Sequence, residues 1–289
     1  MDNNSTAMKT LVVAYDFSKN AEHALKYAMF FAQRLSATVH LVWIDNSCSN
    51  EMLDTIEEEL RIEKKNFLKG LIKEWEEQIP GIRMKYHLGK GKVYQEVSKT
   101  ATRLKADVLF AGTHGISGYE QYWIGSNAYR ITTSAPCPVV TVRCHYEIPE
   151  KLNRILLPLD SSMETRKKLP FAVELAELFG AEIHLLKIYN SPLSVIRKRI
   201  DQFGEEAEKY LKESGVHYTL SALEATNVAT TILNYAEENK IDLITIMTEQ
   251  ETTTASRFLG PYAQQLINSA LMPVMSLRAT YYSQEENEF

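Results

Sequence analysis

Apolar and polar positions follow two alternating patterns along the chain. Short apolar runs rich in Val, Ile and Leu, such as 10–16 and 39–44, are separated by longer stretches in which apolar residues recur at every third or fourth position. The short runs predict buried strands, and the longer stretches predict amphipathic helices. Their alternation predicts an α/β fold in which open parallel sheets of five strands are covered by helices on both faces.

The strand pattern occurs twice, which predicts a tandem repeat of one domain. The equivalent runs are 10–16 and 154–160, 39–44 and 183–188, 107–111 and 242–246, and 138–143 and 273–278. The first two pairs lie 144 positions apart and the last two lie 135 apart, so one difference of nine residues aligns the copies. A polar segment around Pro149 separates them, and we place the domains at 1–148 and 149–289.

The helices expected between these strands also occur in pairs. Ser18 and Ser161 are candidate N-caps of the first helix in each copy, and Ser161 forms a capping box with Glu164. The other helices are expected at 51–78, 92–104 and 125–134 in the first copy and at 192–214, 227–239 and 260–269 in the second. Because each copy ends in an apolar strand that needs cover, we expect 139–143 to pair with 274–278 and form an internal pseudo-dimer.

A cluster of glycines follows the fourth strand of the first copy and leads into a helix. Its residues are Gly112, Gly115, Gly118, Gly125 and Ser126. Glycine lets the backbone approach a polyphosphate closely, and free N–H groups at a helix N-terminus attract anions. Ligands of open parallel sheets bind at the carboxyl ends of the strands, where Asp16 also lies. The sequence therefore predicts a phosphate site at this end of the sheet.

The spacing of these residues resembles the ATP-binding pattern of universal stress proteins: glycine, two residues, glycine, nine residues, glycine, then serine or threonine. The chain is similar to a tandem member of that family over nearly its whole length, which implies a Rossmann-like fold of the adenine nucleotide alpha hydrolase type. The resemblance implies ATP as the ligand, usually with a divalent ion such as Mg²⁺. The binding residues that it implies are Asp16, Ser18, Trp43, Gly112, His114, Gly115, Gly118, Gly125, Ser126 and Asn127.

Some of these residues also have simpler explanations. Asp16 can serve only to cap the first helix, and His114 can serve to shape its loop. Lys90 and Lys92 could reach a phosphate from the loop after the third strand, although a solvated turn explains them as well. Trp43 stands where the family more often has valine, so its contact with adenine can run through the backbone alone.

The second copy lacks the glycine pattern. The residues equivalent to Gly112, His114, Gly115, Gly118 and Ser126 are Met247, Glu249, Gln250, Thr253 and Pro261. Side chains fill the space that a backbone contact needs, Glu249 adds negative charge, and Pro261 removes an N–H donor. We therefore expect one ATP per chain, bound by the first copy, although the retained Asp160 leaves room for a smaller ligand in the second.

The composition limits the classes of function. The net charge of −5 lacks the cationic excess that nucleic-acid binding requires. The N-terminal residues contain no apolar secretion signal, and no apolar run is long enough to span a membrane. The three cysteines, Cys48, Cys137 and Cys144, indicate no disulfide framework. We therefore expect a cytoplasmic protein that binds neither nucleic acid nor a membrane.

Three functions remain open at this point. The leading one is an ATP-binding stress-response module with an unidentified protein partner and room for a further homodimer. No GxxxxGK[ST] motif or acid-base dyad occurs, which disfavours fast hydrolysis, and we assign no catalytic residue. The second function is slow ATP hydrolysis or phosphate transfer by Asp16 and Mg²⁺. The third is an interaction scaffold in which both sites are empty.

Overall fold

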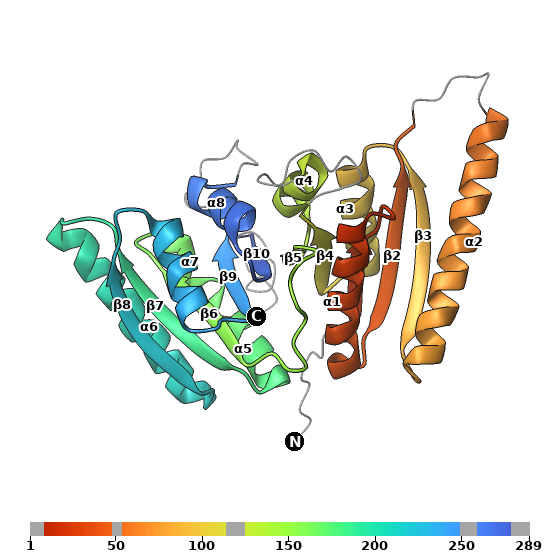
Figure 1. The fold of residues 1–289 in the computed structure, drawn as a ribbon. Coiled ribbons are helices and arrows are strands. Elements are labelled where there is room, and N and C mark those ends of the chain that lie inside the picture. Colours follow the sequence, from red (N-terminus) through yellow and green to blue (C-terminus); the bar gives the residue numbers. More distant parts are fainter. Residues whose placement is uncertain (1–8, 48–53, 114–124, 249–258, 279–289) are drawn as a thin grey trace.

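A computed structural model describes residues 9–47, 54–113, 125–248 and 259–278 of the chain. The predicted site residues His114, Gly115 and Gly118 lie outside these ranges, as do Glu249, Gln250 and Thr253 of the second copy. The described residues form a layered α/β structure in which one twisted sheet runs through the molecule with helices on both faces (Figure 1).

The strands of both copies belong to a single sheet of ten strands in the order β3-β2-β1-β4-β5-β10-β9-β6-β7-β8. The first copy supplies β1 (Thr10–Ala14), β2 (Thr38–Asp45), β3 (Arg83–Lys90), β4 (Val108–Gly112) and β5 (Val139–Val142). The second supplies β6 (Arg154–Leu159), β7 (Glu182–Tyr189), β8 (Tyr218–Glu224), β9 (Leu243–Met247) and β10 (Val274–Leu277). Neighbouring strands are parallel within each copy, as the buried apolar runs predicted.

The predicted pairing of the two last strands is confirmed. β5 and β10 run antiparallel, with Val140 opposite Met275 at the centre of the register. The side-chain hydroxyl of Thr141 also donates to the carbonyl oxygen of Val274 at 3.2 Å. The halves therefore form one continuous sheet where the sequence suggested two separate ones, because each terminal edge strand is covered by the other.

The helices cover the two faces of the sheet in equivalent ways in each half. They are α1 (Lys19–Leu35), α2 (Asp54–Gln78), α3 (Val93–Leu104), α4 (Ser126–Ser134), α5 (Leu169–Phe179), α6 (Ser194–Ser214), α7 (Val228–Glu238) and α8 (Pro261–Ser269). Apolar residues of α1, α2, α5 and α6 form one core cluster, whereas those of α3 and α4 and of α7 and α8 form clusters with other strand residues. Side chains alternate across a strand, so each face has its own core.

The first turn of α1 packs unusually close to the end of β4. The Ser18 hydroxyl accepts a hydrogen bond from the N–H of Ala21 at 3.1 Å, which confirms the predicted N-cap. A Cβ atom at Gly112 would lie 2.6 Å from the carbonyl carbon of Asn20. Since that distance is shorter than real Cβ contacts, the approach of α1 to β4 requires glycine at this position.

The predicted capping box of Ser161 and Glu164 is wrong. A short 3₁₀ turn (Met163–Arg166) follows β6, and α5 begins only at Leu169. The Glu164 carboxylate pairs with the Lys167 ammonium at 2.6 Å and caps no helix. Met247 stands at the end of β9 where β4 has Gly112, and the segment that contacts β9 is the 3₁₀ turn.

Candidate functional site

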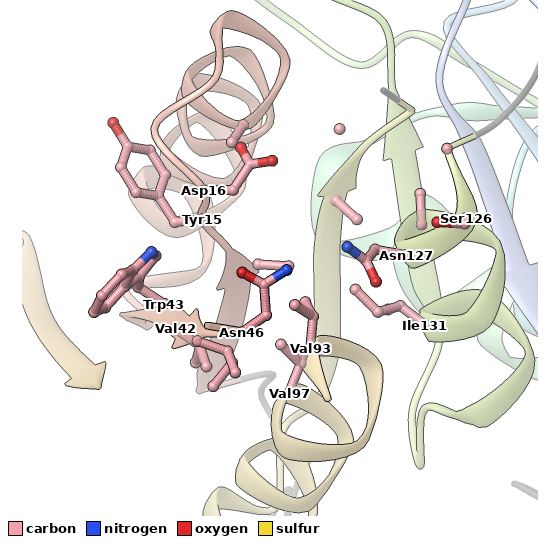
Figure 2. Close-up of a pocket in the computed structure, with 17 residues that line it drawn as sticks. Tyr15, Asp16, Val42, Trp43, Asn46, Val93, Val97, Ser126, Asn127 and Ile131 are labelled. Carbon is pink, nitrogen blue, oxygen red and sulfur yellow. The ribbon is translucent and has the colours of Figure 1, made fainter. Parts of the chain in front are cut away.

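The first half contains a cavity of about 260 Å³ at the carboxyl ends of β1, β2 and β4 (Figure 2). The N-terminal turns of α3 and α4 form its other side. The residues that line it are Ala14, Tyr15, Asp16, Ala21, Val42, Trp43, Ile44, Asn46, Val93, Val97, Ala111, Gly112, Gly125, Ser126, Asn127, Ala128 and Ile131. The structure thus brings Asp16, Trp43, Gly112, Gly125, Ser126 and Asn127, all predicted site residues, to one place.

Asp16 holds the turn between β1 and α1. Its carboxylate accepts a hydrogen bond from the N–H of Ser18 at 3.0 Å, and the intervening Phe17 has a left-handed backbone with φ of 65°. The equivalent Asp160 accepts a hydrogen bond from the N–H of Ser162 at 2.9 Å. The carboxylate therefore accepts from the N–H two residues later in both halves, and this bond of Asp16 alone does not indicate a ligand. Ser18 contributes through its helix cap and does not line the cavity.

Trp43 borders the cavity but belongs mainly to the core beneath α1 and α2. Its side chain is 8% exposed, and its ring centroid lies 6.1 Å from that of Phe17. Phe17 in turn contacts Tyr15 at a centroid distance of 5.2 Å. Burial, with smaller contributions from the nearby Glu22 and Asp16 carboxylates, raises the pKa of Tyr15 to about 12. The Tyr15 phenol therefore stays protonated at neutral pH, which leaves it a hydrogen-bond donor.

The N-terminus of α4 presents polar groups to the cavity. Gly125 is the N-cap residue and provides no side-chain cap, while its N–H donates to the carbonyl oxygen of Thr113 at 2.6 Å. The first N–H groups of a helix have no partner within the helix. Those of α4, together with the side chains of Ser126 and Asn127, can donate to an anion at the cavity wall.

The sequence analysis missed the apolar wall and one amide of this cavity. Val93, Val97 and Ile131 lie on the helix faces that cover the sheet, and helical spacing alone does not separate them from ordinary core residues. Asn46 directly follows β2 and belongs to no motif. Figure 2 shows that the Asn46 and Asn127 side chains point into the cavity from opposite sides.

The equivalent cavity of the second half measures only about 40 Å³. Larger side chains account for the difference. The second half has Pro158 for Ala14, Thr165 for Ala21, Ile246 for Ala111, Met247 for Gly112 and Tyr262 for Asn127. A volume of this size holds a few water molecules at most. The second site is therefore largely filled by the protein's own side chains.

Lys168 is the most unusual residue of this filled site. It stands where α1 has Ala24, and it is 4% exposed. Its ammonium group donates to the Thr165 hydroxyl at 3.2 Å. Burial lowers the pKa of Lys168 to about 8, although the nearby Asp160 acts in the opposite direction. A buried cation thus lies where the first half has only a methyl group.

Two classes of feature are absent from the described ranges. No group of three or more His, Cys, Asp or Glu side chains converges there in a way that could hold a metal ion. Nor does any helix in the same ranges combine the length and the apolar character that crossing a bilayer requires.

Comparisons with known proteins agree with the repeat. The model of the universal stress protein family matches residues 8–143 and again 151–278. A universal stress protein of Methanocaldococcus jannaschii is 28% identical over 150 residues, which cover 49% of this chain and 85% of the relative. A Staphylococcus saprophyticus protein of the same family name is 28% identical over 147 residues, covering 49% and 87%. The crystal structure of a universal stress protein from Archaeoglobus fulgidus has a TM-score of 0.75 at 16% identity, covering 94% of this chain and 96% of that one.

Proposed function

Because the chain belongs to the universal stress protein family, we propose that it is an adenine-nucleotide-binding stress protein whose first half alone holds ATP. The observation that carries this proposal is the difference between the equivalent cavities, about 260 Å³ in the first half and about 40 Å³ in the second. The larger volume approaches the roughly 300 Å³ at which small-molecule sites begin. We place the boundary of the two functional units between residues 148 and 149.

The lining of the first cavity suits the parts of a nucleotide. Val93, Val97 and Ile131 offer an apolar wall for a base, and the end of β2 beside Trp43 offers backbone groups for its polar edge. A ribose attached to that base would lie near Asp16, whose carboxylate could accept hydrogen bonds from its hydroxyl groups. The α4 N-terminus would receive the phosphates, together with the glycine-rich loop at 112–125, part of which lies outside the described residues.

Mg²⁺ would bind to such a nucleotide mainly through the phosphate oxygens. It keeps several water ligands and needs only one or two protein carboxylates when a substrate supplies phosphates. Asp16 is the one carboxylate among the described residues that line this cavity. The site is therefore compatible with a nucleotide-bound ion, even without a cage of protein ligands.

Isothermal titration of the full chain with Mg·ATP tests the proposal. The expected result is one ATP per chain. An Ala111→Ile variant, which introduces the side chain that the second half has at Ile246, should abolish binding because it fills the cavity. The matched control is Leu271→Ile, an exposed site that lines neither cavity, and it should bind like the wild type. A stoichiometry near two, or unchanged binding by Ala111→Ile, would contradict the proposal.

Slow ATP hydrolysis is the second candidate, and only Asp16 favours it. This carboxylate faces the cavity, but it already accepts a hydrogen bond from the Ser18 N–H. No histidine among the described residues lines the cavity to act as a general base. Phosphate release at about 1 s⁻¹ or faster, lost in Asp16→Asn, would establish an enzyme in place of a binding protein.

A further inference from the structure

A second hollow adjoins the proposed nucleotide cavity. It has a volume of about 540 Å³ and is lined by Asn46, Ser47, Lys90, Gly91, Lys92, Val93, Tyr94, Asn127 and Arg130. Asn46, Val93 and Asn127 line both volumes, so the two adjoin along these three residues. We call this hollow the basic groove, after its three cations Lys90, Lys92 and Arg130.

The basic groove is positive in a chain whose net charge is −5. None of its described lining residues is acidic. Glu96, the closest acidic neighbour along α3, is paired with Lys99 at 2.6 Å. The Arg130 guanidinium lies 5.2 Å from the centre of the Tyr94 ring, which holds it beside the N-terminus of α3. The Asp45 carboxylate interacts electrostatically with Lys90 and offsets part of its charge. Lys92 and Arg130 are therefore the cations that we expect to meet an anion in the groove.

The second half of the chain provides an internal comparison. The residues equivalent to Lys90, Lys92, Tyr94 and Arg130 are Ala225, Asn227, Ala229 and Gln265. The Asn227 side chain caps α7 by accepting from the Thr230 N–H at 3.0 Å, whereas Lys92 at the same position of α3 makes no side-chain cap. All three cations are thus absent from the half whose cavity is filled. If the cations only belonged to a solvated turn, they would have no reason to occur together with the open cavity. A site for an anionic ligand explains why both occur in the first half and neither in the second.

We propose that the basic groove binds the terminal phosphates of a nucleoside triphosphate whose base and ribose occupy the adjoining cavity. This inference rests on the proposed function and adds the residues that favour a triphosphate over a monophosphate. A nucleotide can enter the groove between Asn46 and Asn127, where the two volumes meet. Lys92 and Arg130 then supply charge-assisted hydrogen bonds to phosphate oxygens. The backbone N–H groups at the α4 N-terminus bind the phosphate nearest to the ribose.

The test compares affinities for ATP, ADP and AMP, measured without divalent ions by isothermal titration of the full chain. The wild type should bind ATP more tightly than AMP. The Lys92→Gln, Arg130→Gln double variant should weaken ATP binding about tenfold at low ionic strength, because two exposed cations each contribute modestly. AMP affinity should change less than twofold. The matched control, Lys69→Gln with Lys73→Gln on the exposed side of α2, removes the same charge and should leave both affinities unchanged.

The outcomes separate this inference from the proposed function. If the double variant lowers the affinities for ATP and AMP equally, or lowers neither, the groove does not bind the terminal phosphates. The proposal that the first half binds a nucleotide is unaffected by that result. If the wild type binds no adenine nucleotide, both proposals fall. Tripolyphosphate should compete with ATP for the wild type, and simultaneous binding of both would show that the groove serves a separate anion and overturn the inference.

Discussion

Gly112 is the position at which one added methyl group should cost the most. In Gly112→Ala the new Cβ would lie 2.6 Å from the carbonyl carbon of Asn20, 2.7 Å from its Cβ and 2.8 Å from its carbonyl oxygen. These are atoms of the first turn of α1 and cannot turn aside as a flexible side chain can. Either the start of α1 must move away from β4, or β4 must move within the sheet.

The free-energy cost follows from the two ways of relieving this contact. Overpacking of a tight site costs about 1–3 kcal/mol. A displaced first turn also weakens the hydrogen bond between the Ala21 N–H and the Ser18 hydroxyl, and loss of an N-cap costs about 1 kcal/mol. Alanine also lowers the conformational entropy of the unfolded chain, which stabilises the folded state by about 0.5 kcal/mol. We expect Gly112→Ala to lower the free energy of unfolding by about 2 kcal/mol.

Gly70→Ala is the matched control, because it makes the same chemical change at an open position. A Cβ at Gly70 meets no atom within 4 Å, and the residue lies inside α2. Alanine should stabilise that helix by about 0.5–1 kcal/mol. Urea unfolding followed by circular dichroism measures both variants. If Gly112→Ala proves as stable as the wild type, the close approach of α1 to β4 is not a constraint on this position.

Four further predictions concern other parts of the chain. Ser18→Ala should lower the free energy of unfolding by about 1 kcal/mol in urea titrations, and Ser18→Asp should restore it, because either side chain caps α1. Lys168→Met should stabilise the protein by up to about 3 kcal/mol at pH 7, because burial lowers the pKa of Lys168 to about 8 in the folded state. This gain should shrink between pH 8 and 10.5, where the folded state has already released the proton. An unchanged gain over that range, or the same gain in the exposed Lys198→Met, would contradict this. Burial, with His87 and Lys85 nearby, lowers the pKa of His40 to about 4. As the pH falls, the unfolded state therefore takes up a proton before the folded state does, and the free energy of unfolding should decrease between pH 6.5 and 4. This decrease should be less steep in His40→Gln. Residues 1–148 alone should dimerise or aggregate because β5 loses its partner, and light scattering from a stable monomer would refute this.

The periodic parts of the fold could be predicted from the sequence because they depend on local patterns. Buried apolar runs identified the strands, and Ser18 marked the start of α1 because its cap involves only residues that are three apart. The start of α5 could not be found this way, because Ser161 and Glu164 have the spacing of a capping box although the chain forms a 3₁₀ turn there. The glycines and Asp16 marked the candidate site from the residues themselves, and the family resemblance added Trp43 and Asn127. Asn46 and Arg130 carry no local signal.

The second half shows that the fold persists without the open cavity. Of the residues that fill its cavity, Pro158, Ile246 and Met247 still pair with β7 or β10, so the sheet persists although the cavity is filled. β10 is still required, because it forms the antiparallel pair that covers β5 of the first half. A ligand site can therefore be lost from one copy while that copy remains necessary to the other. It follows that a change at Lys168 should alter the stability of the whole chain and leave the affinity of the first half for ATP unchanged.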